Sequence, residues 1–192
     1  MTVSSGGTVG GTLTTGALTL QSGGIVSPGN SPGTLTSSSA TLLTGASYTL
    51  QMNNDGSTGS AGLNWDKIAL TGNLNVTALN ATDTFGITLQ TLNGSNALGL
   101  LTSFDSSSDH IWSSVITTGG ITGTFASNLF AINTAGFQNS FNGSFNLVQN
   151  GNNLDLVYTA AVPEPGTWAM MIGGLAMLVA IQRRRSTVHA KI

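Results

Sequence analysis

The feature that most restricts the fold is the shortness of the apolar segments between residues 8 and 52. Apolar and polar residues alternate there in segments of only a few residues: 12–14, 17–20, 24–26, 34–36 and 48–50. Gly-Gly, Thr-Gly and Pro-Gly pairs separate these segments, and such pairs favour turns. Alternation with a period of two predicts short strands. The body shows no helical periodicity, which excludes a sheet built from βαβ units.

Strands this short supply only one or two small inward-facing side chains each. That is too little apolar volume to fill the core of a β-sandwich. The same strands can stack as coils of a solenoid, because each coil then contributes only a thin column to the core. The body is therefore predicted to be all-β, a right-handed parallel β-solenoid.

The end of the body predicts a hairpin. Asn150-Gly151 lies between two alternating apolar segments and is the strongest short signal for a two-residue hairpin turn. A turn at these two residues places Leu147 opposite Leu154 and Phe145 opposite Leu156, so that both pairs are apolar. We expect this antiparallel hairpin to close the solenoid. Upstream, residues 97–104 fit either a strand or a short helix, and residues 105–111 fit a polar loop.

The last thirty residues differ from everything before them. Pro163 and Pro165 fix the backbone on either side of Glu164 and predict a stiff, extended segment that does not join a helix. Seventeen uncharged residues follow, 166–182, and then three arginines, 183–185. At ~1.5 Å of rise per residue the uncharged run makes a helix of about 25 Å, against a hydrocarbon core of about 30 Å. The arginines predict a single transmembrane helix with its C-terminus in the cytoplasm and the body outside.

Three parts of this tail, in this order, resemble the PEP-CTERM sorting signal: Val162, Pro163, Glu164 and Pro165; the apolar run from Trp168; and Arg183, Arg184 and Arg185. The resemblance implies recognition of Val162 to Pro165 and removal of the tail by exosortase, a membrane-embedded, transpeptidase-like cysteine enzyme. It also implies that the three arginines set the membrane orientation. Such proteins belong to bacteria with an outer membrane, often alongside exopolysaccharide production.

The implied partners are therefore exosortase and, through residues 166–182, the inner membrane; exopolysaccharide is considered as a further partner. The implied localisation is export, with transient anchoring in the inner membrane and the body outside the cytoplasm. The final location is then the cell surface or the extracellular space.

A second resemblance concerns the body. Pro28 and Pro32 lie in GGIVSPGNSPGTLT, residues 23–36, and predict two turns that form a corner. This stretch resembles a segment of autotransporter passenger domains and related bacterial surface β-helices, just before their final coils. The resemblance extends over residues 6–76 and implies a β-helix.

The sequence thus predicts two domains: a β-solenoid body, residues 1–160, and a sorting tail, residues 161–192. The expected fold class is all-β, a right-handed parallel β-solenoid closed by an antiparallel hairpin, plus a single C-terminal transmembrane helix. The first residues contain neither a positively charged region nor an apolar run, so no secretory signal is recognised. Proteins with this tail normally carry one, and we expect the body to be N-terminally truncated.

Composition excludes several classes of protein. The absence of cysteine excludes a disulfide framework, a thiol nucleophile and cysteine-ligated metals. Residues 1–162 contain one lysine and six aspartates, a net charge of −5. This body lacks the basic footprint of a nucleic-acid-binding protein.

Candidate catalytic groups are few. His110 next to Asp109, among many serines, is the one possible Ser-His-Asp set, but no Gly-x-Ser-x-Gly motif accompanies it. A solvated loop histidine is the expected role. Polysaccharide cleavage needs paired carboxylates at a defined separation, and Asp105 and Asp109 are close only within one loop. We predict no enzyme activity, no catalytic residues and no cofactor.

Asp55 and Asp66 flank a loop that is a candidate for calcium binding, with Asn53, Asn54 and Ser57 as further oxygen donors. They lack the ligand density of known calcium loops, so no metal site is predicted.

The sequence favours an exported structural or adhesive protein of the cell surface or extracellular matrix. One alternative is a polysaccharide-acting β-helix enzyme. Another is a passenger fragment of an autotransporter. That class predicts a C-terminal barrel of alternating strands, whereas this chain ends in an apolar run followed by arginines.

Overall fold

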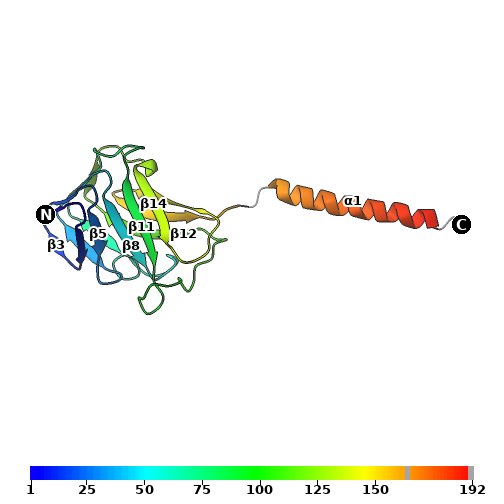
Figure 1. Cartoon of the computed structure of the whole chain (residues 1–192), viewed down its shortest axis with the longest axis horizontal. Coiled ribbons are helices and arrows are strands. Elements are labelled where there is room, and N and C mark those ends of the chain that lie inside the picture. The colour runs from blue at the N-terminus through cyan, green and yellow to red at the C-terminus, as the bar shows by residue number, and fades with distance from the viewer. Residues whose placement is uncertain (163–164, 190–192) are drawn as a thin grey trace. The chain divides into compact units, whose positions relative to one another are not determined.

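The computed structural model describes residues 1–162 and 165–189. The chain divides into two compact units, Met1–Ala160 and Ala161–Ile192. The first unit, the body, is built from strands and includes a short 3-10 helix, η1 (Ser127–Leu129). The second unit contains helix α1 (Pro165–His189). Figure 1 shows the strands of the body and the single long helix.

The strands of the body form three sheets, and successive strands enter these sheets in rotation. Sheet A contains β1 (Thr2–Val3), β4 (Leu18–Leu20), β7 (Ala40–Leu42), β10 (Asn73–Asn75) and β13 (Gly120–Thr122). Sheet B contains β2 (Thr8–Gly11), β5 (Ile25–Pro28), β8 (Ser47–Met52), β11 (Phe85–Thr91) and β14 (Phe130–Gly136). Sheet C contains β3 (Thr14–Thr15), β6 (Thr34–Ser37), β9 (Lys67–Leu70), β12 (His110–Thr117), β15 (Ser144–Asn150) and β16 (Asn153–Thr159).

Because of this rotation, the strands of each parallel pair lie three apart in the chain. In sheet B, β5, β8, β11 and β14 run side by side and parallel (Figure 1). The parallel pairs of sheets A and C follow the same rule. We call one run of the chain through the three sheets a pass. A strand of a few residues is sufficient because its parallel partners come from the preceding and the following pass.

Alternation of side chains explains why these short segments form strands. In β8, Tyr48, Leu50 and Met52 are buried and the residues between them are half-buried. In β11, the same pattern buries Phe85, Ile87 and Leu89. The outward positions carry hydroxyl or amide groups. In sheet A the cross-strand register aligns five of them on adjacent strands: Thr2, Thr19, Thr41, Asn75 and Thr122. β-Branched threonine suits such half-exposed positions.

The core widens from small aliphatic residues near the N-terminus to aromatic residues further along the chain. Val3, Leu18 and Leu20 fill the first passes, whereas Trp65 and Trp112 are fully enclosed later. Both indole groups find backbone acceptors: Trp65 donates to the Ser113 carbonyl at 2.8 Å, and Trp112 donates to the Asn54 carbonyl at 2.7 Å. These bonds are needed because a buried N–H group without a partner costs about 1–3 kcal/mol.

A buried aspartate fastens the predicted corner between β5 and β6. Gly29 has a φ of 74° and lies so close to Gly33 that a Cβ atom on either residue would collide with the other's backbone. The carboxylate of Asp66 accepts hydrogen bonds from the backbone N–H groups of Gly33 (2.8 Å) and Gln51 (2.9 Å). Asp66 is fully buried, and this burial raises its pKa to about 7. The two prolines thus form the predicted corner, but a residue more than thirty positions away holds it.

A second buried carboxylate supports an irregular point in β12. The register of β12 against β16 shifts between Trp112 and Ile116, and Ser114 has a positive φ of 57°. Asp155 accepts the Ser114 N–H at 2.6 Å and the Asn150 side-chain amide at 3.0 Å. The bulge is therefore fixed by side chains, as expected where a non-glycine residue adopts positive φ.

The predicted hairpin is present, but its register was predicted wrongly. The pairs are Asn150↔Asn153, Leu147↔Leu156 and Phe145↔Tyr158, so the turn consists of Gly151 and Asn152. Gly151 alone in the turn has a positive φ, 61°. This is the pattern of a turn that places glycine at its first central position rather than its second. Shifting the turn by one residue shifts every cross-strand partner by two and keeps the same side chains facing the core.

The predicted fold class was wrong. The β content and parallel pairing are as expected, but no closed solenoid is formed: the strands make three sheets of five, five and six strands. The hairpin does not seal an end. Instead β16 pairs antiparallel with β12, so the hairpin extends sheet C into a mixed sheet. The expected transmembrane helix is also not found: within residues 1–162 and 165–189, no helix combines the length and apolarity needed to cross a membrane.

Local differences follow the same logic. Residues 97–104 form neither a strand nor a helix, and Leu98 makes only an isolated bridge to Leu92. The expected polar loop at residues 105–111 ends early, because His110 already begins β12.

Asp66 predicts a pH dependence of stability. Its pKa is 3.8 in the unfolded reference and about 7 in the fold, so the folded state binds the proton more tightly. The free energy of unfolding should therefore fall as pH rises from about 4 to about 7, by a few kcal/mol at most, since one pKa unit corresponds to about 1.4 kcal/mol. Urea unfolding at several pH values measures this change.

The matched variants for this measurement are Asp66→Asn and Asp83→Asn. Asp66→Asn should flatten the pH profile and cost about 1–3 kcal/mol at low pH, because an amide nitrogen replaces one of the two acceptors. Asp83 is exposed, so its replacement should leave the profile unchanged. An unchanged slope in Asp66→Asn would refute the role given to Asp66.

Candidate functional site

The candidate site is the exit of the chain from the body and the tail that follows. The last strand, β16, ends at Thr159, and its register with β12 ends at the pair His110↔Tyr158. Tyr158 is fully buried, and its hydroxyl donates to the Ser106 carbonyl at 2.9 Å and accepts the Gly143 N–H at 2.9 Å. The body is thus tightly packed up to its final strand.

Beyond that strand the chain becomes exposed within three residues. Ala160 still packs against the core, and its N–H donates to Oδ1 of Asp109 at 2.8 Å. Ala161 is exposed, and 83% of Val162 is accessible to solvent. Of the predicted recognition residues, Val162 is therefore open to a partner, whereas Pro163 and Glu164 lie outside the described residues.

Helix α1 begins at Pro165 and runs for 25 residues. The expectation that Pro165 would not join a helix was wrong, because proline suits the first turn, where its missing N–H has no intrahelical partner. The helix also extends beyond the uncharged run, so that Arg183, Arg184 and Arg185 lie within it.

The apolar side chains of α1 surround the helix instead of lying along one face. Nine large ones are at least 45% exposed: Trp168, Met170, Met171, Ile172, Leu175, Met177, Leu178, Val179 and Ile181. Exposed apolar surface of this kind marks an interaction segment. The surface of α1 contrasts with the body, whose apolar residues are mostly enclosed.

The candidate catalytic groups do not form a triad. His110 is buried, not solvated as expected, and its ring stacks on Phe104 with ring centres 4.7 Å apart. Its Nε2 lies 2.8 Å from the backbone carbonyl of Asp105, while the Asp109 carboxylate binds the Ala160 N–H. His110 thus stabilises the loop before β12, and Asp109 binds the end of the body at Ala160.

Asp105 has a separate role within the same loop. Its carboxylate accepts hydrogen bonds from the backbone and hydroxyl of Ser107 and from the hydroxyl of Ser108. These bonds hold the pKa of Asp105 below its usual value. They stabilise the ionised form and shape a tight turn.

The two aspartates of the candidate calcium loop also bind different parts of the chain. Asp55 accepts the backbone and hydroxyl of Ser57, whereas both oxygens of Asp66 bind the backbone at the corner. Over the part of the chain that the structure describes, no three acidic, histidine or cysteine side chains lie close enough together to hold a metal ion.

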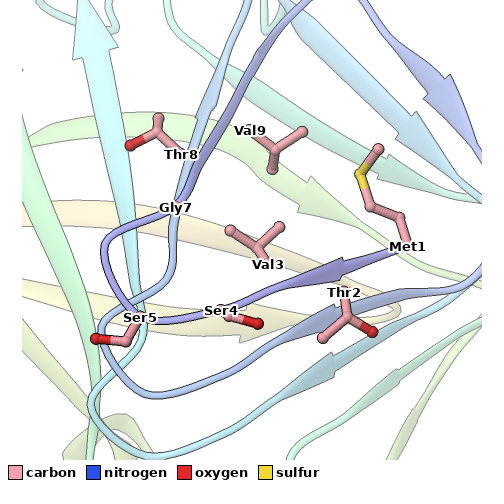
Figure 2. Close-up of a pocket in the computed structure, with 8 residues that line it drawn as sticks. All are labelled: Met1, Thr2, Val3, Ser4, Ser5, Gly7, Thr8 and Val9. Atoms are coloured by element: carbon pink, nitrogen blue, oxygen red, sulfur yellow. The ribbon is translucent and has the colours of Figure 1, made fainter.

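A cavity of about 400 Å³ lies at the outer edge of the first strands. Figure 2 shows the side chains of Val3 and Val9 close together in it, with Met1 alongside. The other lining residues are Thr2, Ser4, Ser5, Gly7 and Thr8, and none of these side chains titrates near neutral pH. The amino group of Met1 is bound to the Ala17 carbonyl at 2.6 Å. The cavity therefore contains no acid–base pair.

Comparison with known protein families decides the role of the tail. Residues 161–186 match the PEP-CTERM protein-sorting motif. This chain carries a PEP-CTERM sorting motif. The match covers Val162 to Pro165 and Arg183 to Arg185, and it begins one residue after Ala160. No curated protein matches the chain.

The PEP-CTERM motif implies export by the exosortase sorting route, with exosortase as the processing partner and membrane-anchored transit. The expected resemblance to this group is thereby confirmed for the tail. The resemblance of the body to autotransporter passenger domains is not confirmed and stays a prediction.

Sequence reasoning missed the residues that shape the chain exit. From the sequence, Asp109 is a candidate only as a partner of His110 or of Asp105, and Ala160 is only the last residue of the body. Their contact joins residues 51 positions apart, and no periodicity or motif marks it. The one available signal was an aspartate directly before a strand, where its carboxylate can accept a backbone N–H that no neighbouring strand reaches.

The body should fold without the tail. Its hydrogen bonds close within residues 1–160, including the bond from Ala160 to Asp109. A chain of residues 1–160 should keep the β-type circular dichroism spectrum and unfold within about 3 °C of the full chain, a difference of less than about 1 kcal/mol. Thermal unfolding of both chains measures this, and loss of cooperative unfolding in the shorter chain would contradict it.

Proposed function

We propose that this is an exported, non-enzymatic structural or adhesive protein of the cell surface or extracellular matrix, delivered through its PEP-CTERM tail. The observation that carries the proposal is the sorting motif at residues 161–186, directly adjoining the end of the folded body. Such an arrangement separates delivery from cargo. The tail can be recognised and removed while the body stays intact.

Exposure of the tail supports recognition by a membrane enzyme. Val162 is open, and α1 presents apolar side chains all around its axis. We infer that residues 166–182 associate with the inner membrane during transit, because apolar surface of this extent is stabilised by lipid or by a membrane protein. The body, with a single lysine, offers little attraction for anionic lipid headgroups.

The carboxylates of several acidic residues accept hydrogen bonds from the backbone, which supports a non-enzymatic body. Asp66 and Asp155 hold backbone N–H groups inside the fold, and Asp109 holds the chain exit. Carboxylates that perform such structural tasks are poorly placed to exchange protons with a substrate. A body without a poised acid–base pair fits a scaffold better than a hydrolase.

The outer faces of the sheets support contact with exopolysaccharide. In sheet A, the outward column of Thr2, Thr19, Thr41, Asn75 and Thr122 carries hydroxyl and amide groups on adjacent strands. Adjacent strands lie about 4.8 Å apart, so these groups form a regular, uncharged array of hydrogen-bonding groups. Sugar hydroxyls can donate to and accept from such groups.

The sorting function predicts exosortase-dependent processing. In cells that contain exosortase the full chain should lose its tail and appear outside the cytoplasm, whereas in cells without the enzyme it should keep its full mass. Intact-mass measurement of fractionated cells checks this. Equal mass and location in both strains would refute the sorting function.

Matched variants locate the recognition. Replacing Pro163 and Pro165 by alanine, or Glu164 by glutamine, should leave most of the chain unprocessed because the motif loses its stiff backbone or its carboxylate. Thr187→Ala lies outside the matched segment and should be processed like the wild type.

The scaffold role predicts binding to exopolysaccharide without cleavage. The full chain should sediment with exopolysaccharide from the producing cells and leave the polymer length unchanged. Replacing Thr19 and Thr41 together by valine should weaken sedimentation, because valine keeps the shape and removes the hydroxyl groups. Thr124→Val, at an exposed position outside the strands, is the control. Shortening of the polymer would instead establish the enzyme alternative.

A further inference from the structure

The loop that precedes β12 grips the last residues of the body at two points. The Ser106 carbonyl accepts the Tyr158 hydroxyl at 2.9 Å, and three residues further along the loop the Asp109 carboxylate accepts the Ala160 N–H at 2.8 Å. The loop itself is braced by the bonds from Ser107 and Ser108 to Asp105 and by the contact of His110 with the Asp105 carbonyl. Asp109 is therefore presented by a tight turn.

The position of this contact is informative. The ladder between β12 and β16 ends at His110↔Tyr158, and the ladder between β15 and β16 ends at Ser144↔Thr159. No strand is left to accept the Ala160 N–H, and the Asp109 side chain takes that place. The sorting motif begins at the next residue, Ala161. Two independent observations, a hydrogen bond to the Ala160 N–H and a motif boundary directly after Ala160, thus meet at the same residue.

We propose that Asp109 is a positioning residue for tail processing: its carboxylate holds the backbone of Ala160, so that the segment available to the processing enzyme begins at Ala161. This inference rests on the proposed function. The hydrogen bond keeps Thr159 and Ala160 attached to the sheet, while Ala161 and Val162 are exposed. A processing enzyme that binds extended backbone then meets a fixed starting point.

The proposal separates the acceptor from the charge of Asp109. Asp109→Asn keeps an oxygen acceptor for the Ala160 N–H, whereas Asp109→Ala removes it. Asp109 is exposed, so neither change disturbs the core. The pair of variants therefore tests the hydrogen bond, and Asp83→Asn, at another exposed aspartate, controls for loss of surface charge.

The first measurement is amide hydrogen exchange of the full chain. The Ala160 amide should be protected in the wild type and in Asp109→Asn, and it should exchange about tenfold faster in Asp109→Ala, as expected for loss of one hydrogen bond to a carboxylate. Equal exchange in wild type and Asp109→Ala would overturn the proposal, because the contact would then not hold Ala160.

The second measurement is the C-terminus of the processed body, read by intact mass from cells containing exosortase. Wild type and Asp109→Asn should give one C-terminus, whereas Asp109→Ala should give several, including ends nearer to Thr159. A single, unchanged end in Asp109→Ala would overturn the positioning role even if exchange is faster. If the wild-type tail is not removed at all, the proposed function fails, and hydrogen exchange alone decides whether Asp109 holds Ala160.

Discussion

The structure depends on hydrogen bonding between passes of the chain. Because successive strands enter three sheets in turn, each parallel pair joins strands that lie three apart in the chain, and these strands can be short. Each pass then adds a thin apolar layer, such as Tyr48, Leu50 and Met52 in β8, to a shared core. This constraint explains why a sequence rich in glycine and threonine forms a well-packed body: turns and short alternating segments are what each pass requires.

The sequence predicted the features that depend on neighbouring residues. Alternation at residues 48–50 predicted a strand, the Pro28–Pro32 segment predicted a corner, and Asn150-Gly151 indicated a hairpin. It did not predict features that depend on distant residues. The register of the hairpin was missed because Gly151 can occupy either central turn position, and the difference is a choice of backbone conformation. The three open sheets were missed because short strands alone do not determine whether the hairpin seals an end or joins a sheet.

In the candidate site, too, the features set by consecutive residues were predictable and those set by distant residues were not. The tail was predictable because its information lies in consecutive residues: two prolines around a glutamate, an apolar run and three arginines. The aspartates of the body were not, because their partners lie far along the chain. Asp66 binds Gly33 and Gln51, and Asp155 binds Ser114 at the bulge of β12. In a body with so few charged groups, these acids serve mainly as acceptors for backbone that no strand can reach.

The exposed apolar side chains of α1 make the surface of the chain with its tail different from the surface of the body alone. Nine of the large hydrophobic residues that face outward belong to this helix, whereas the body conceals most of its own. A chain that still carries the helix therefore exposes many more large apolar side chains than the body alone does. Removing the tail at one peptide bond takes these side chains away and leaves the hydrogen bonds of the three sheets in place.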